Sequence, residues 1–178
     1  MRTPLPSPPR VYLAGPDVFF PEPLSIARTR KAFLAEIGLI GVFPLDSQGA
    51  QSPTSSSAAA IFRTNCELID SCPGVLANLS PFRGPSADVG TAWELGYAFG
   101  RGKPVSAYSD DLSGYRDKVF TGGWSDAPQA TRDKNGNEIE DFGDIDNLML
   151  TQSVIAISGS FEEAALKLKR LFNRLSAS

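Results

Sequence analysis

The sequence of 178 residues contains no histidine and only two cysteines, Cys66 and Cys72. The lack of histidine excludes Ser-His-Asp and Cys-His catalysis, and it excludes metal sites built on imidazole ligands. The two cysteines are six positions apart, which puts them on different faces of a helix and indicates neither a CxxC redox pair nor a metal site. We therefore expect no metal and no cofactor, and any acid–base or nucleophilic chemistry must come from carboxylates, tyrosine, lysine or serine.

Positive charge and long apolar runs are also scarce. The net charge is −3, and no dense cluster of lysine and arginine is present, which argues against binding of a nucleic-acid backbone. No apolar run approaches the length that spans a bilayer, so no membrane partner is expected. The proline-rich start, MRTPLPSPPR, lacks the apolar centre of a signal peptide. We expect residues 1–9 to form a disordered leader and the protein to be cytoplasmic.

The rest of the chain alternates between short apolar segments and amphipathic ones, and its length suits one domain, at residues 10–178. The short apolar segments predict strands, and the amphipathic segments predict helices. The expected strands are 10–15, 39–45, 74–79, 104–108 and 154–158, and the expected helices are 23–37, 58–71, the segment after residue 88, 144–153 and 160–175. Residues 109–143 have little periodicity, so we expect a long loop or insertion there.

This order of elements predicts an α/β fold: a flavodoxin-like (Rossmann-like) five-stranded parallel sheet with helices on both faces. Five strands suggest the order 2-1-3-4-5, in which ligands bind beyond the carboxyl ends of the strands, at the switch point between strands 1 and 3. Residues 12–19 and 78–94 lie along that edge. A binding or catalytic site is therefore expected between these two segments.

Two carboxylates lie in the second of these segments. Asp88 and Glu94 are six residues apart at the start of the expected helix. One interpretation is structural: Asp88 is an N-cap, and Thr91-x-x-Glu94 matches a capping box. The other is functional: the positive end of the helix keeps Glu94 ionised and nucleophilic. Two carboxylates then suit glycosidic-bond chemistry through a covalent sugar–enzyme intermediate. The residues alone leave both interpretations open.

Three segments resemble one known family. VYLAGP (11–16), ANLSPFRGPSADVGTAWELGYA (77–98) and DNLML (146–150) are together similar to the nucleoside 2-deoxyribosyltransferases, particularly the branch with an SPFRG loop. The resemblance covers about residues 10–172. It implies transfer of a 2-deoxyribosyl group between nucleobases in deoxyribonucleoside salvage, through a covalent glutamate intermediate and with retention at C1′. It also implies deoxynucleosides and free nucleobases as small-molecule partners, and a homo-oligomer whose sites are completed by a neighbouring subunit.

The resemblance implies catalytic roles for three residues. Glu94 matches the nucleophile that attacks C1′ of the deoxyribose. Asp88 matches the carboxylate that contacts the sugar hydroxyls and helps to position the nucleophile. Tyr12 matches the tyrosine that holds the nucleophile's carboxylate by a hydrogen bond; the alternative is a strand tyrosine packed in the core.

Four further residues are implied for substrate binding. Asn147 and Met149 match a pair that reaches into the neighbour's site, where Asn147 binds the 5′-hydroxyl. Gln48 matches a base-contacting glutamine. Asn65 stands where some members have an aspartate that faces the base as a candidate proton donor. An amide can hydrogen-bond the base but cannot act as a general acid, so the base proton must come from a site carboxylate or from water.

Three alternatives remain beside transfer. An N-glycoside hydrolase that acts on 2′-deoxynucleoside 5′-monophosphates shares the fold and the nucleophile, but Asn147 and the acidic DIDNLML around it favour a free 5′-hydroxyl. The stretch VGTAWE faintly resembles the GTxxE motif of the cytokinin-activating phosphoribohydrolases, without the glycine-rich stretch that precedes it there. A nucleotide-sensing domain without turnover would keep the pocket, but it would not need the carboxylates and the tyrosine together.

Overall fold

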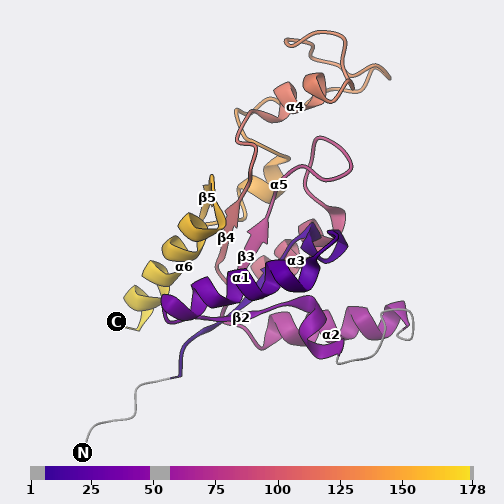
Figure 1. Ribbon diagram of the computed structural model, residues 1–178. Coiled ribbons are helices and arrows are strands. Elements are labelled where there is room, and N and C mark those ends of the chain that lie inside the picture. The colour runs from indigo at the N-terminus through magenta and orange to yellow at the C-terminus, as the bar shows by residue number, and fades with distance from the viewer. Residues whose placement is uncertain (1–6, 49–56, 177–178) are drawn as a thin grey trace, which may run out of the picture.

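The computed structural model describes residues 7–48 and 57–176, so residues 1–6 of the expected leader lie outside the described part. Five parallel strands form one sheet in the order β2-β1-β3-β4-β5 (Figure 1). The predicted α/β flavodoxin-like architecture and its strand order are confirmed. The strands are β1 (Arg10–Ala14), β2 (Ile40–Val42), β3 (Gly74–Asn78), β4 (Val105–Tyr108) and β5 (Ala156–Ser158).

Helices cover both faces of the sheet (Figure 1). One face carries α1 (Pro23–Glu36) and α6 (Phe161–Leu175). The other face carries α2 (Ala58–Asp70), α3 (Val89–Gly100) and α5 (Leu148–Thr151). Two short 3₁₀ helices follow the first two strands, η1 (Pro16–Phe19) and η2 (Pro44–Gln48). None of the described helices is long and apolar enough to cross a membrane.

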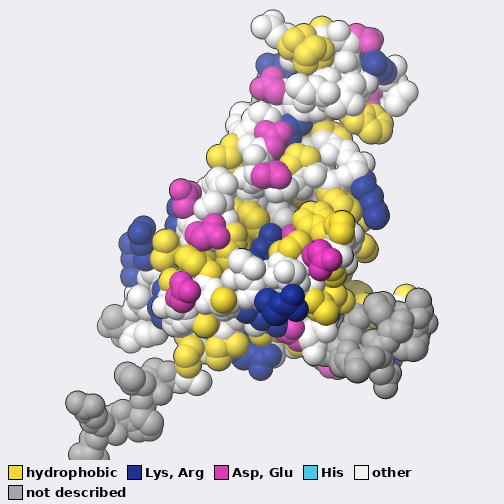
Figure 2. Space-filling model, viewed as in Figure 1, with side chains coloured by type: hydrophobic (Ala, Val, Ile, Leu, Met, Phe, Trp, Pro, Cys, Tyr) yellow, Lys and Arg dark blue, Asp and Glu magenta, His cyan; other side chains and the backbone are white. Residues whose placement is uncertain are grey.

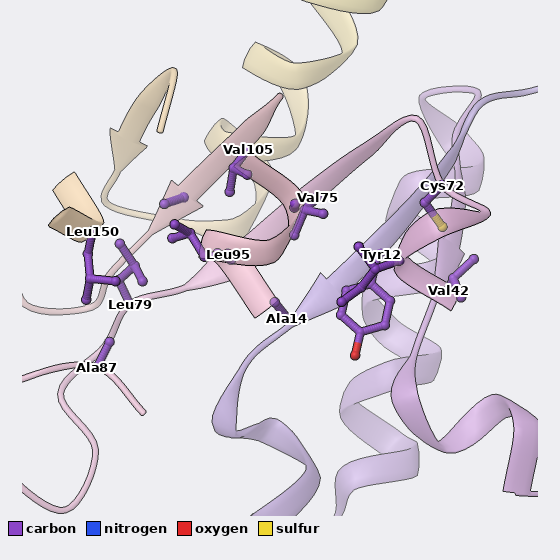
Figure 3. Packing of buried hydrophobic residues seen from close by; sticks show 14 residues of the cluster. Tyr12, Ala14, Val42, Cys72, Val75, Leu79, Ala87, Leu95, Val105 and Leu150 are labelled. Carbon is purple, nitrogen blue, oxygen red and sulfur yellow. The ribbon is translucent and has the colours of Figure 1, made fainter. Parts of the chain in front are cut away.

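The hydrophobic core lies on both sides of the sheet because successive strand residues point to opposite faces. On β1, Val11 and Leu13 pack with the α1 and α6 side, whereas Tyr12 and Ala14 pack with the α3 side. Figure 3 shows this second cluster, with the Tyr12 ring among apolar side chains and its hydroxyl at the edge of the cluster. Burial of the ring therefore leaves the polar end of Tyr12 available to the neighbouring helix.

The segment 109–143, expected to be a loop, contains a helix that the sequence analysis missed, α4 (Tyr115–Thr121). This helix has seven residues and follows Gly114, which provides no side-chain cap, so its pattern is too short to stand out. The buried Lys118 ties α4 to the body by donating a 2.9 Å hydrogen bond to the carbonyl of Ile145. Figures 1 and 2 show the segment projecting from the body as a separate lobe.

Candidate active site

The site lies where β1 and β3, which are neighbours in the sheet, lead into different loops. The chain after β1 enters η1, and the chain after β3 enters the loop 79–88 that precedes α3. Gly15 is required here because a Cβ would lie 2.4 Å from a carboxylate oxygen of Asp17 and 2.9 Å from the Cβ of Asn78. The divergence of the two loops after β1 and β3 forms the switch point, which is where open α/β sheets bind their ligands.

Tyr12 and Glu94 form the central contact of the site. The Tyr12 hydroxyl donates a 2.6 Å hydrogen bond to Glu94 Oε1. The tyrosine comes from β1 and is fully buried, and the glutamate comes from the second turn of α3 and is partly exposed. Tyr12 is thus a core residue that also holds a carboxylate, so its two interpretations from the sequence are compatible.

Asp88 is the N-cap of α3. Its Oδ2 accepts hydrogen bonds from the backbone nitrogen of Thr91 at 3.0 Å and from Thr91 Oγ1 at 3.2 Å. The predicted capping box is wrong, because α3 begins at Val89 and Thr91 already lies in its first turn. The cap is provided by Asp88, and Glu94 lies beyond the first turn with its carboxylate directed to Tyr12.

Its surroundings raise the pKa of Glu94 to about 7. Burial is the largest cause, because it disfavours the charged form; the hydrogen bond from Tyr12 lowers the pKa, and the negative charge of Asp88 raises it. Burial therefore opposes the ionisation that was expected from the position of Glu94 near a helix start. Burial also raises the pKa of Tyr12, with a further increase from the charge of Glu94, so the hydroxyl keeps its proton and remains a donor.

Asn65 of α2 reaches the same carboxylate. Its Nδ2 lies 3.5 Å from Glu94 Oε1. Aromatic contacts hold α2 and α3 together: the Trp93 ring meets Phe62 edge-on, with 5.0 Å between centroids, and stacks on Tyr97 at 5.1 Å. These contacts keep the amide beside the carboxylate, so the structure brings together one predicted residue from each of β1, α2 and α3.

The other predicted binding residues lie elsewhere. Asn147 is the N-cap of α5, and its Oδ1 accepts a 3.0 Å hydrogen bond from the backbone nitrogen of Met149. The Met149 side chain is 72% exposed. Within the described part of the chain, no hydrogen bond joins either residue to Glu94. Gln48 is the last residue of η2, and its side chain lies outside the described residues.

Asp146 has a structural role that the sequence analysis missed. Its buried carboxylate accepts hydrogen bonds from Ser86 Oγ and from the backbone nitrogens of Ala87 (2.8 Å) and Asn147 (2.7 Å). These bonds join the loop that ends at Asp88 to the segment before α5. The acidic DIDNLML segment is expected to favour a free 5′-hydroxyl over a phosphate, but the carboxylate of Asp146 within it is buried and bonded internally.

A second buried carboxylate, Asp17 of η1, joins the loop after β1 to helix α1 and to the end of β3. It pairs with Arg30 of α1 at 2.5 Å, and Asn78 Nδ2 lies 3.4 Å from its Oδ1. The Arg30 guanidinium also lies over the rings of Tyr108 and Phe161. No sequence pattern indicated this pair, because its members are 13 positions apart on different elements.

The site therefore presents a buried carboxylate, a tyrosine donor and an amide at the switch point of an open parallel sheet. Among the residues that the structure describes, no three His, Cys, Asp or Glu side chains are grouped to hold a metal ion. Open α/β sheets bind small molecules at such an edge, so this combination is typical of a ligand-binding site. Residues 11–149 match the sequence profile of the nucleoside 2-deoxyribosyltransferase family, and the chain belongs to that family. It is an enzyme of the deoxyribosyltransferase or glycosidase kind, whose family substrates are nucleosides and nucleobases.

Individual proteins and solved structures are also similar to this chain. A 2-desoxiribosyltransferase from Leishmania mexicana superposes with a TM-score of 0.74 and 30% identity, over 92% of this chain and 98% of that one. The sequence is 32% identical to the uncharacterized protein C191.05c of Schizosaccharomyces pombe, over 92% of this chain and 85% of the relative. A 2-deoxyribosyltransferase from Bacillus psychrosaccharolyticus shares the fold, with a TM-score of 0.57 and 23% identity, over 88% of this chain and 90% of that one.

Proposed function

We propose that the domain of residues 10–178 transfers the 2-deoxyribosyl group from one nucleobase to another, with Glu94 as the nucleophile. The observation that carries the proposal is the 2.6 Å hydrogen bond from Tyr12 to Glu94 Oε1. It fixes the carboxylate on one oxygen, and the other oxygen, Oε2, accepts no hydrogen bond within the described residues. The same proposal assigns the activity to cytoplasmic salvage of deoxynucleosides.

The proposed reaction has two displacements at C1′. In the first, a Glu94 oxygen attacks C1′, the bond from C1′ to the base nitrogen breaks, and its electron pair leaves with the base, which takes up a proton. In the second, a nitrogen of the incoming base attacks C1′, the ester bond breaks, the base loses a proton, and the carboxylate is regenerated. Two inversions give retention of configuration. Asp88 would hold the sugar hydroxyls, and the proton for the leaving base would come from a site carboxylate or water, because Asn65 is not an acid.

The function is tested by incubating the protein with deoxyinosine and adenine and separating the products by chromatography. Transfer predicts new deoxyadenosine together with hypoxanthine. Hypoxanthine with free deoxyribose, and without deoxyadenosine, would replace the proposal with N-glycoside hydrolysis. Bound nucleoside without any product would point to a sensing domain and overturn the catalytic assignment.

The pKa of Glu94 sets the expected pH dependence. The nucleophile must be ionised, so kcat/KM for deoxyinosine should fall as the pH drops below about 7, the value to which burial raises the pKa. Tyr12→Phe should move this midpoint to higher pH, because it removes the hydrogen bond that lowers the pKa. Asp88→Asn should move it to lower pH, because it removes a charge that raises the pKa while the amide oxygen can still cap α3. Identical midpoints in the three proteins would contradict the assignment of this limb to Glu94.

We also propose that the protein is a homo-oligomer in which Asn147 and Met149 complete a neighbouring site. The support is an exposed apolar surface near α3 and α5: Val89 is 85% and Met149 72% exposed. On the outer side of α3, Gly96 has no atom within 4 Å of where a Cβ would lie, so the backbone is open to close approach. Light scattering should give a multiple of the 19.1 kDa chain mass, and a monomer at assay concentration would contradict this part of the proposal.

A further inference from the structure

Glu140, a residue of the segment 109–143, holds the side chain of Asn147. Glu140 Oε1 accepts a 2.6 Å hydrogen bond from Asn147 Nδ2, and Oε2 accepts a 3.1 Å hydrogen bond from the backbone nitrogen of Leu148. Asn147 Oδ1 is bonded in turn to the backbone nitrogen of Met149. Both ends of the amide are therefore held and its orientation is fixed. One N–H and one lone pair of the amide remain for a ligand.

These two side chains line a cavity of about 270 Å³ between the projecting segment and the loop 79–88, which contributes Pro85. Two aromatic walls, Tyr115 and Trp124, and two further carboxylates, Asp133 and Glu138, also line it. Among the described residues that line the cavity, none is a lysine or an arginine. Such a cavity favours a neutral ligand with hydroxyl groups over an anion, because its lining offers an anion carboxylates and no cationic side chain.

The carboxylate of Glu140 differs from the other two in its partners. Glu138 pairs with Arg132 at 2.9 Å and its side chain is 80% exposed, so its charge is compensated and screened. Asp133 accepts hydrogen bonds from the backbone of its own turn. Glu140 has no salt-bridge partner within the described residues, and it alone among the three carboxylates contacts Asn147.

Asp146 connects this cavity to the rest of the proposed site. Its carboxylate bonds the backbone nitrogen of Ala87 on one side and that of Asn147 on the other. Ala87 precedes Asp88, so one buried group joins Asp88 of this chain's own site to Asn147, which the proposal places in the neighbouring subunit's site. Figure 2 shows acidic side chains on the visible surface where the projecting lobe meets the body.

We infer that Glu140 determines specificity at the 5′ end of the nucleoside, by fixing Asn147 toward a 5′-hydroxyl and by repelling a 5′-phosphate. This inference rests on the proposed function, in which Asn147 completes a deoxynucleoside site. A hydroxyl can donate its proton to the carboxylate of Glu140. A phosphate carries about −1.5 to −2 charges at neutral pH. It would be repelled by the carboxylate of Glu140, which provides no hydrogen-bond donor.

The test is equilibrium binding of deoxyinosine and of deoxyinosine 5′-monophosphate, measured by calorimetry in a Glu94→Ala background so that neither compound is consumed. The background protein should bind deoxyinosine more tightly than its monophosphate. Adding Glu140→Gln, which keeps the size of the side chain and removes its charge, should reduce this preference by about tenfold. The change should come mainly from tighter binding of the monophosphate. Adding Asp126→Asn instead should leave the preference within about twofold, because that carboxylate lies outside the cavity lining, is 85% exposed and pairs with Lys134.

Ionic strength provides a second measurement that needs no change at Glu140. Salt screens the repulsion between Glu140 and a phosphate. The preference of the background protein for deoxyinosine over its monophosphate should therefore be smaller at high salt than at low salt. Three results would overturn the inference: a preference that neither Glu140→Gln nor salt changes, a background preference for the monophosphate, or binding of neither compound. A wild-type protein that shows these binding properties but no deoxyribosyl transfer would overturn the proposed function and leave this inference standing.

Discussion

Glu94→Ala should reduce deoxyribosyl transfer from deoxyinosine to adenine by at least about a thousandfold, because it removes the group that forms the covalent bond to C1′. The loss should appear in kcat, since the carboxylate acts in the chemical step rather than in holding the base. Burst measurements and mass spectrometry of the quenched protein should detect a deoxyribosyl adduct in the wild type and none in the variant. A variant that retains substantial transfer would refute the role of Glu94 as nucleophile.

The matched control is Glu67→Ala, which removes an exposed carboxylate from α2. It should leave transfer unchanged. Thermal unfolding of both variants checks that they fold, because Glu94→Ala leaves the buried Tyr12 hydroxyl without its acceptor. The pKa of Glu94 is raised in the folded protein, so stability from this group is present at low pH and is lost as the pH rises through about 7. At pH 8 the removal of this partly buried charge should therefore offset part of the cost of the lost hydrogen bond.

Arg30→Ala should lower the free energy of unfolding by about 3 kcal/mol, which corresponds to roughly 6–12 °C in Tm for a chain of this size. The variant leaves Asp17 as a buried charge without its partner, since this side chain is only 2% exposed. It also removes the guanidinium that packs over the rings of Tyr108 and Phe161. Thermal and denaturant unfolding of the variant and the wild type provide the measurement.

Lys31→Ala is the control for this prediction. Lys31 is the next residue of α1 and also forms an ion pair, with Asp46, but the two side chains are 32% and 36% exposed. An exposed pair contributes about 0–1 kcal/mol, so this variant should unfold close to the wild type. The double change Arg30→Met with Asp17→Asn should recover part of the loss, because no buried charge is left unpaired. Equal effects of Arg30→Ala and Lys31→Ala would show that burial does not set the cost.

The fold was predictable because each strand is a short apolar segment followed by turn residues or an amphipathic helix. Parallel strands joined by helices allow few arrangements, and the predicted order is the observed one. The same logic located the site: once β1 and β3 are neighbours, Tyr12 and the start of α3 must share an edge. The resemblance to a family supplied the pairing of Tyr12 with Glu94, which the hydrogen bond between them now gives in atomic detail.

The features that the sequence did not indicate are hydrogen bonds and ion pairs between side chains or backbone groups of separate elements. Asp17 and Arg30, or Asp146 and Ala87, have no common periodicity or motif, so only the folded chain brings them together. The raised pKa of Glu94 was not indicated for a similar reason. Its position near a helix start is visible in the sequence, whereas the burial that raises the pKa depends on the packing of the folded chain. Glu140 was overlooked because it lies in a segment without a regular pattern.

The two tryptophans of the chain lie in the two regions that matter most for these proposals. Trp93 is next to Glu94, stacks on Tyr97 of α3 and meets Phe62 of α2 edge-on, whereas Trp124 lines the acidic cavity. No other residue of this type is present. Replacing either one by phenylalanine therefore leaves a single tryptophan, so that the tryptophan emission of one variant reports on the carboxylate site and that of the other on the projecting lobe.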